Sequence, residues 1–362
     1  MVANTDDRAF SDLAIPPGEL LAEELEARGM TQRELADRTG RPGQKISEII
    51  NGKKSITYDT ALELEKVLGI PAHFWVNLEA SYQLTKARLR EKSHLEEQEH
   101  WLEFFPVRQL WARRCIPRSR DKRETVAALL KFFGVASFST LWQRQGALLQ
   151  EYRITPKSRV SEGALWVWLR VGDLEAREIE TVAYNEHRFL NVLSEIRSLT
   201  AERPAVIFPR MRELCASAGV AFVVIKEFPK SGANGVARWL STDKAMIQLS
   251  TKRRWTDIFW FSFYHEAKHV LDREKKRTFV NGINDDPDAE AGADRFAQEM
   301  LIPPDEWAGF VASGGWSPVR VREFAQLVGI HPGIVVGRLQ HERLVAYAKL
   351  NELRSRFVWS DD

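Results

Sequence analysis

Residues 265–269 read His-Glu-Ala-Lys-His, two histidines four positions apart with a glutamate directly after the first. On a helix this spacing places both imidazoles on one face, about one turn apart, where they can bind the same zinc ion. Glu266 then lies beside the metal, where its carboxylate can take a proton from a bound water whose pKa zinc lowers to about 7. The pattern predicts a zinc centre with His265 and His269 as ligands, Glu266 as general base, and hydrolysis of an amide bond.

The segment before this motif, residues 257–264, is strongly apolar. The histidines therefore emerge from a buried helix, where unpaired polar groups would be costly. Two histidines that are satisfied by hydrogen bonds alone remain the structural alternative to a metal site.

A third ligand is expected in the segment NDDPDAEAGADRFAQEMLIP, where Pro287 and the acids before it mark the start of a helix. Glu290 falls in the first turns of that helix and is our candidate ligand. Asp294, one turn later on the same face, is a candidate hydrogen-bond partner of a ligating histidine. Asp286 and Asp288 are alternative ligands, and all four acids would also favour a helix N-terminus without any metal.

Two further histidines lie near the end of the chain, His331 before a proline and His341 in LQHERL. Either could stabilise an oxyanion during hydrolysis. We favour a structural or surface role for both.

The first eighty residues read as short amphipathic helices with clear end signals. Thr31 and Glu34 have the spacing of a capping box at the start of one helix, and Gly40 ends it. A further helix covers roughly residues 43–50, and Asn51-Gly52 closes it. In the next helix, residues 57–68, the side chains expected to face mostly inward are Leu62, Leu64, Val67 and Leu68.

Two helices joined by a tight turn at Gly40, the second with isoleucines facing inward, are typical of a helix-turn-helix motif. The second helix of such a motif lies in the DNA major groove, where Gln and Lys suit base edges, while side chains around it hold phosphates. A helical bundle that binds protein is the alternative, because residues 1–82 carry nine Lys and Arg against fourteen Asp and Glu. The candidate base-contacting residues are Gln44, Lys45 and Ser47, and the candidate phosphate-contacting residues are Gln32, Arg33, Lys53 and Lys54.

This region resembles the HigA-type branch of the XRE, or lambda-repressor-like, helix-turn-helix regulators. The resemblance covers about residues 15–84, and its most specific part runs from INGKKSIT through TALELEKVLGI to FWVNLEASYQL. It implies a five-helix domain that binds operator DNA and commonly forms a homodimer.

Beyond residue 85 the pattern stays mainly helical until about residue 200 and then changes. GVAFVVIKEF and AMIQLS are β-branched and aromatic runs separated by the turn-rich SGANG, and they predict two or three strands before the helix that carries HEAKH. We therefore expect a mainly α protein with a small β-sheet (α+β). The expected domains are residues 1–84 for the helix-turn-helix, 85–200 for a helical connecting region, and 201–362 for the catalytic domain.

A second resemblance concerns the catalytic domain. DIFWFSFYHEAKHVLD followed by EAGADRFAQEMLIP is similar to the ImmA/IrrE family of metallopeptidases, whose members carry HExxH and then an E-x-x-A-[ND]-x-F-A block ending in proline. ALWVWLRVGDLEA and HPGIVVGRLQHERL extend the similarity over most of residues 105–350. It implies a zincin-like domain with His265, His269 and Glu290 as ligands and Glu266 as base. One departure is Lys268, where the family usually has Gly or Ala.

Composition places the protein among ordinary soluble chains, with 44% hydrophobic and 28% charged residues over 362 positions. Two cysteines are consistent with a reducing compartment. No signal peptide is visible, and no apolar run approaches the roughly 20 residues that span a bilayer. We expect a cytoplasmic protein that does not bind membranes.

Taken together, these features predict a cytoplasmic transcription regulator whose DNA-binding domain is coupled to a zinc metalloendopeptidase. Its expected partners are double-stranded operator DNA and a protein substrate, such as a repressor. The alternative is a non-catalytic HigA-like repressor or antitoxin, in which the zincin-like domain only binds a ligand or a partner toxin.

Overall fold

The computed structural model describes residues 14–143, 161–232, 234–250, 255–272, 279–280 and 287–357. The chain divides into two compact units, Met1–Glu99 and His100–Asp362. Each unit has its own cluster of buried hydrophobic side chains. The connecting region expected at residues 85–200 is thus divided between the two units.

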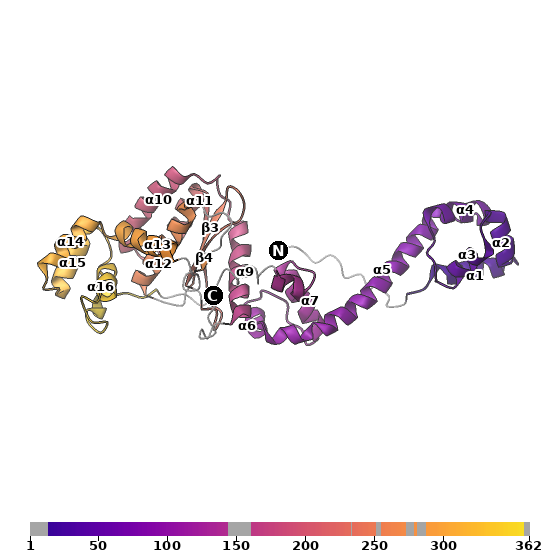
Figure 1. Cartoon of the computed structure of the whole chain (residues 1–362), viewed down its shortest axis with the longest axis horizontal. Coiled ribbons are helices and arrows are strands. Elements are labelled where there is room, and N and C mark those ends of the chain that lie inside the picture. Colours follow the sequence, from indigo (N-terminus) through magenta and orange to yellow (C-terminus); the bar gives the residue numbers. More distant parts are fainter. Residues whose placement is uncertain are drawn as a thin grey trace. The chain divides into compact units, whose positions relative to one another are not determined.

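The first unit is an all-helical bundle (Figure 1), and its five helices confirm the expected helix-turn-helix domain. Leu21, Leu35, Ile46 and Trp75 are fully buried in its core. The fifth helix continues well past residue 84, where the sequence placed the domain boundary. The helices are α1 (Pro17–Ala27), α2 (Gln32–Thr39), α3 (Gly43–Ile50), α4 (Tyr58–Leu68) and α5 (Ala72–Glu97).

Local capping signals define the helix-turn-helix. The Thr31 hydroxyl accepts a hydrogen bond from the Glu34 backbone N–H at 3.1 Å, which caps α2. The Glu34 carboxylate completes no reciprocal bond, because it pairs with Arg38 instead. Gly40 adopts φ 67°, a left-handed conformation that costs little without a Cβ, and it ends α2 as predicted.

One inward-facing prediction in this unit was wrong. Leu64 and Leu68 of α4 are buried, but Leu62 is 51% exposed. Leu62 lies two residues from Leu64, which on a helix turns the two side chains to different faces.

The second unit contains a four-stranded sheet with helices packed on it (Figure 1). The strands are β1 (Val220–Ile225), β2 (Gly235–Trp239), β3 (Ala245–Ser250) and β4 (Phe279–Val280). Their order is β1-β3-β2-β4, with β1 parallel to β3 and β2 antiparallel to both β3 and β4. The two runs predicted as strands are β1 and β3.

The helices and 3₁₀ turns of the second unit surround this sheet and extend beyond it. Among the described residues they are η1 (Glu99–Glu103), α6 (Val107–Ala112), α7 (Lys122–Phe133), α9 (Glu162–Glu178), α10 (Glu186–Ser198), η2 (Leu199–Ala201), α11 (Pro204–Ser217), α12 (Thr256–Leu271), α13 (Pro287–Leu301), α14 (Pro304–Ser313), α15 (Pro318–Val328), α16 (Pro332–His341) and η3 (Asn351–Leu353).

Helix α12 is the central helix of this unit and contacts β2, β3, α13 and α16. Phe259, Trp260 and Phe263 are buried on it. The Tyr264 hydroxyl donates a hydrogen bond to the Leu193 carbonyl of α10 at 2.9 Å. The residues that follow Tyr264 are therefore held in a fixed position between the sheet and α13.

One stretch, Lys122–Gln143, has the length and apolar composition of a membrane span, contrary to the expectation from sequence. It is not a single α-helix, because Gly134 ends α7 in a left-handed conformation. Val126, Leu129 and Phe133 are buried within the fold.

Candidate metal centre and nucleic-acid interface

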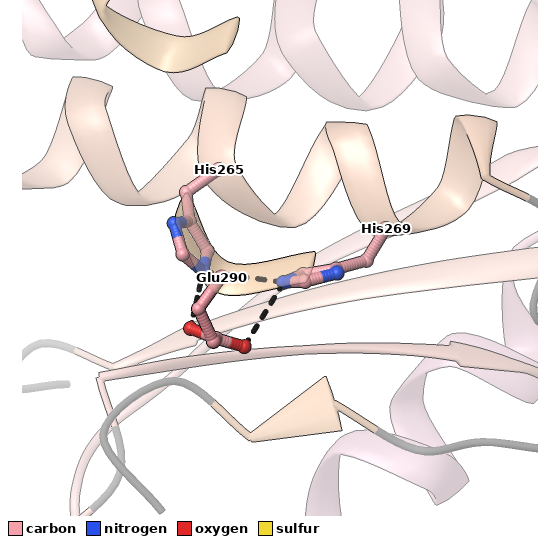
Figure 2. Close-up of side chains that lie close together, drawn as sticks. All are labelled: His265, His269 and Glu290. Carbon is pink, nitrogen blue, oxygen red and sulfur yellow. Dashed lines mark hydrogen bonds and ion pairs between the residues drawn. The ribbon is translucent and has the colours of Figure 1, made fainter. Parts of the chain in front are cut away.

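The candidate metal centre is built from two helices. His265 and His269 lie one turn apart on α12, and Glu290 reaches them from the first turns of α13 (Figure 2). The two imidazoles are 2% and 3% exposed, and Glu290 is half-buried. The structure thus brings together the three residues that the sequence named as ligands, with their ligand atoms all within 4.8 Å of one another.

The separations between these atoms match a tetrahedral cation site. His265 Nε2 lies 3.2 Å from His269 Nε2 and 3.2 Å from Glu290 Oε2, and His269 Nε2 lies 3.4 Å from Glu290 Oε1. Zinc bonds of about 2.0–2.2 Å in tetrahedral geometry place neighbouring ligand atoms roughly 3.3–3.5 Å apart. Two imidazole nitrogens and a carboxylate also form a ligand set that zinc prefers, so the residues fit this metal.

The charges of this cluster are strongly coupled. Although burial disfavours the charged imidazole, hydrogen bonds to Asp294 and Glu290 and the charges of Glu266 and Glu290 raise the pKa of His265 to about 10. Burial would raise the pKa of Glu290, but hydrogen bonds and charges from His265 and His269 lower it to about 2. The charges of His265 and Glu290 therefore stabilise each other.

Asp294 lies on the other side of His265, with Oδ1 2.8 Å from Nδ1. This contact places the Nδ1 proton toward the carboxylate and leaves Nε2 facing His269 and Glu290. Of the two alternative ligands, only Asp288 lies in the described part of the chain, and it is not in the cluster. Asp288 is exposed on α13, and Asp286 lies outside the described residues.

Glu266 is fully buried, and neither of its carboxylate oxygens makes a hydrogen bond among the described residues. Burial raises the pKa of Glu266 to about 8, although the charge of His265 and the Ala237 backbone N–H favour its ionised form. An unpartnered buried carboxylate is costly in a fold that has no use for it. A group with this pKa is suited to exchange a proton near neutral pH.

Strand β2 contributes a residue that the sequence analysis missed. A Cβ on Gly235 would lie 2.6 Å from Glu266 Oε1, so only glycine leaves room for this carboxylate. The sequence signal was the glycine at the end of SGANG, but nothing local connected it to the histidine helix.

Lys268, the departure from the ImmA/IrrE pattern, does not crowd the site. Its ammonium group forms an ion pair with Asp272, one turn further along α12. The side chain is 28% exposed, so its stem runs outward while the histidines on either side stay buried.

His331 and His341 differ in their surroundings. His331 caps α16 by accepting a hydrogen bond from the Gly333 N–H at 3.0 Å, and its Nε2 lies 3.4 Å from Ser355 Oγ. His341 is exposed and lines a cavity that also borders His265 and Glu290. The structural or surface role favoured from sequence suits His331, which caps a helix, and is compatible with the exposure of His341, which in addition lines the cavity beside the candidate site.

The candidate nucleic-acid interface lies in the first unit. Gln32, Arg33 and Gln44 are exposed, and Lys45 and Ser47 are half-buried on α3. The Ser47 hydroxyl already has one partner, because it accepts a hydrogen bond from the Asn51 side-chain amide at 3.3 Å. The helix that would enter a groove thus keeps polar side chains on its outer side while Ile46 and Ile49 pack inward.

Charge on this surface is less positive than the sequence positions suggested. Lys53 and Lys54 are both exposed, but Lys54 Nζ lies 2.6 Å from the carboxylate of Glu48 on α3. This contact lowers the pKa of Glu48. Tyr58, at the start of α4, is 76% exposed and was not among the predicted contact residues.

Comparisons with known proteins match the first unit. A family model described as Helix-turn-helix matches residues 21–75. Virulence-associated protein I of Dichelobacter nodosus is 37% identical over 81 residues, which cover 22% of this chain and 75% of that protein. Virulence-associated protein A of the same organism is 35% identical over 65 residues, which cover 17% of this chain and 62% of that protein, so the chain spans less than two thirds of this second relative.

Solved structures give a similar result. The structure of an addiction module antidote protein of a HigA family from Coxiella burnetii shares 38% sequence identity. The match covers 24% of this chain and 94% of that one, with a TM-score of 0.22.

Proposed function

We propose that the protein is a cytoplasmic transcription regulator that couples DNA binding to zinc-dependent proteolysis. The proposal for DNA binding rests on the first domain, which belongs to the XRE family of helix-turn-helix regulators with HigA-like members. The DNA partner is a double-stranded operator, which a homodimer would read through α3. The protein substrate is a repressor or another regulatory protein.

The set of separations among His265, His269 and Glu290 carries the proposal for the second unit. His265, His269 and Glu290 would supply three ligands to a zinc ion, the number of protein ligands in catalytic zinc sites. Zinc, when bound, lowers the pKa of a water molecule and polarises the carbonyl of a peptide bond. The proton transfers and the orientation of the ligands are carried out by side chains of the protein.

Glu266 acts as general base and then as general acid. A carboxylate oxygen takes a proton from the attacking water as the water oxygen bonds to the carbonyl carbon. The same carboxyl group then gives that proton to the amide nitrogen as the C–N bond breaks, which releases an acid and an amine. Asp294 keeps the ring of His265 oriented throughout by holding its Nδ1 proton.

The metal centre is tested by measuring zinc per chain in the purified full-length protein. We expect about one zinc per chain for the wild type and a large loss for Glu290→Ala. Asp288→Ala is the matched control, because Asp288 is an exposed acid on the same helix. Absence of zinc from the wild type after reconstitution would rule out the zinc peptidase.

Catalysis is tested by incubating the zinc-loaded protein alone and with candidate repressors, and by following fragments on a gel. Glu266→Gln should retain zinc and form no fragments. Fragments unchanged in that variant would rule out Glu266 as the base.

A second candidate function is favoured by the HigA-like first domain itself. In this alternative the protein is a non-catalytic repressor or antitoxin whose second unit binds a ligand or a partner toxin. Glu266→Gln would then leave repression in cells unchanged, whereas Lys45→Ala would weaken operator binding in either case.

A further inference from the structure

A cavity of about 430 Å³ adjoins the candidate metal centre. Its lining includes His265, Glu290 and Asp294, so any occupant of the cavity also meets a metal ion held by these side chains. Exposed His341 is part of the same lining, which means that the cavity opens to solvent. Cavities of this size enclose small ligands or a bulky side chain with its neighbouring backbone.

Apolar side chains from three helices form one part of the cavity wall, and the uncharged polar side chains of Asn234, Ser262 and Gln298 line another part. Ile258 and Phe261 project from α12, Leu301 and Ile302 lie at the end of α13, and Ile334 lies on α16. The Phe261 ring is close to two histidines of the cavity lining: its centroid is 6.2 Å from that of His265 and 6.5 Å from that of His341.

The formal charges in the described lining are already paired. Asp257 Oδ2 lies 2.8 Å from Arg354, and Arg338 Nε lies 2.9 Å from Glu342. Asp294 is held by His265, as described above. An occupant that carried its own charge would have to be desolvated without a free counter-ion, which is unfavourable.

We propose that this cavity is a specificity pocket that receives a bulky, uncharged side chain of the protein substrate, adjacent to the bond that is cleaved at the metal centre. The proposal rests on the proposed metal centre and adds the class of substrate. The same cavity is lined by the apolar side chains and by the ligands His265 and Glu290. This arrangement favours a side chain of a substrate that is cleaved at the metal, because a free apolar metabolite would not need the metal.

The pocket can be tested by binding, without turnover. The probes are four hydroxamic acids that share the metal-binding group and differ in the attached group, which is methyl, isobutyl, benzyl or carboxymethyl. Their dissociation constants are measured by calorimetry on the zinc-loaded full-length protein. We expect the benzyl and isobutyl compounds to bind roughly tenfold or more tightly than the methyl compound, because they bury apolar surface.

Two variants connect that preference to the cavity. Ile258→Trp narrows the cavity and should remove most of the benzyl preference while leaving the methyl compound within about twofold of the wild type. Phe261→Ala enlarges it and should shift the preference toward a naphthylmethyl compound. Val319→Trp adds the same side chain at an exposed position of α15 outside the cavity, and it should change nothing.

Each alternative result is distinct. Tightest binding of the carboxymethyl compound, or equal binding of all four, would overturn the pocket and leave the metal centre intact. Benzyl alcohol that binds equally well with and without zinc, and that Ile258→Trp blocks, would assign the cavity to a free small molecule. Failure of the protein to bind zinc would instead overturn the proposed function on which the pocket depends.

Discussion

Asp294 Oδ1 lies 2.8 Å from Nδ1 of His265, while Nε2 of the same ring faces His269 and Glu290. A carboxylate in this position fixes the orientation and tautomer of a ligating imidazole. We expect Asp294→Ala to weaken zinc binding by roughly 10–100-fold. Asp294→Asn, which keeps an acceptor oxygen, should lose less. Competition with a chromophoric chelator measures both affinities.

The control for this effect is Glu299→Ala, which removes an exposed acid from the same helix. Its zinc affinity should equal that of the wild type. An equal loss in both variants would mean that the acids of α13 act through general charge and that the contact with His265 is irrelevant.

Much of the first unit could be predicted because its signals are local. The Thr31 cap and the Gly40 stop each act within a few residues, and the structure has both. The side chain of Glu34 could not be predicted so well, because its choice between the Thr31 backbone and Arg38 depends on a small difference in energy.

The second unit contains relationships that no local pattern predicts. Spacing on one helix suggested that His265 and His269 lie together, but Glu290 reaches them only because α13 packs against α12. Gly235 comes to lie beside Glu266 through the pairing of β2 within the sheet, and α16 brings His341 to the cavity. Such contacts depend on tertiary packing rather than on propensity.

Gly235 offers a test of how closely β2 approaches the proposed base. A Cβ at this position would lie 2.6 Å from Glu266 Oε1, so Gly235→Ala must displace the carboxylate. We expect zinc content to be retained and peptide cleavage to fall by an order of magnitude or more, at a cost of about 1–3 kcal/mol in the free energy of unfolding. Zinc analysis, cleavage rates and denaturant unfolding measure these three quantities.

Gly292→Ala is the matched control, since a Cβ there meets nothing within 4 Å. It lies on α13, close in sequence to Glu290, and should keep zinc content, activity and stability. If Gly235→Ala cleaved peptide at the wild-type rate, the close approach of β2 would be unimportant for Glu266.

Zinc affinity should depend on pH in a defined direction. Although burial opposes it, contacts with Asp294 and Glu290 raise the pKa of His265 to about 10, so the metal-free protein holds a proton there at neutral pH. Zinc must displace that proton, and its affinity should therefore rise with pH and level off only near pH 10. One displaced proton corresponds to roughly a tenfold gain per pH unit.

Chelator competition at pH 6.5, 7.5 and 8.5 measures this slope. Asp294→Ala removes the strongest of the groups that raise the pKa of His265, so its affinity should level off at a lower pH. A wild-type affinity that stays constant over this range would show that His265 is already deprotonated before zinc binds.

The ion pair between Lys54 and Glu48 predicts that two neighbouring lysines contribute unequally to DNA binding. Lys54 Nζ lies 2.6 Å from Glu48, whereas Lys53 is exposed and forms no ion pair among the described residues. We expect Lys53→Ala to reduce the slope of log affinity against log salt by about 1, and Lys54→Ala to change it less.

Removal of the Glu48 carboxylate should abolish this difference between the two lysines. Glu48→Gln frees Lys54 for a phosphate, so affinity for a mixed-sequence duplex should increase and the salt slope should steepen by about 0.9. Fluorescence anisotropy at several salt concentrations gives both quantities. Glu26→Gln, which removes an exposed acid of α1, is the control for net charge. If it tightened binding and steepened the slope as much as Glu48→Gln, total charge would govern DNA binding, and the pairing of Lys54 would have no specific effect.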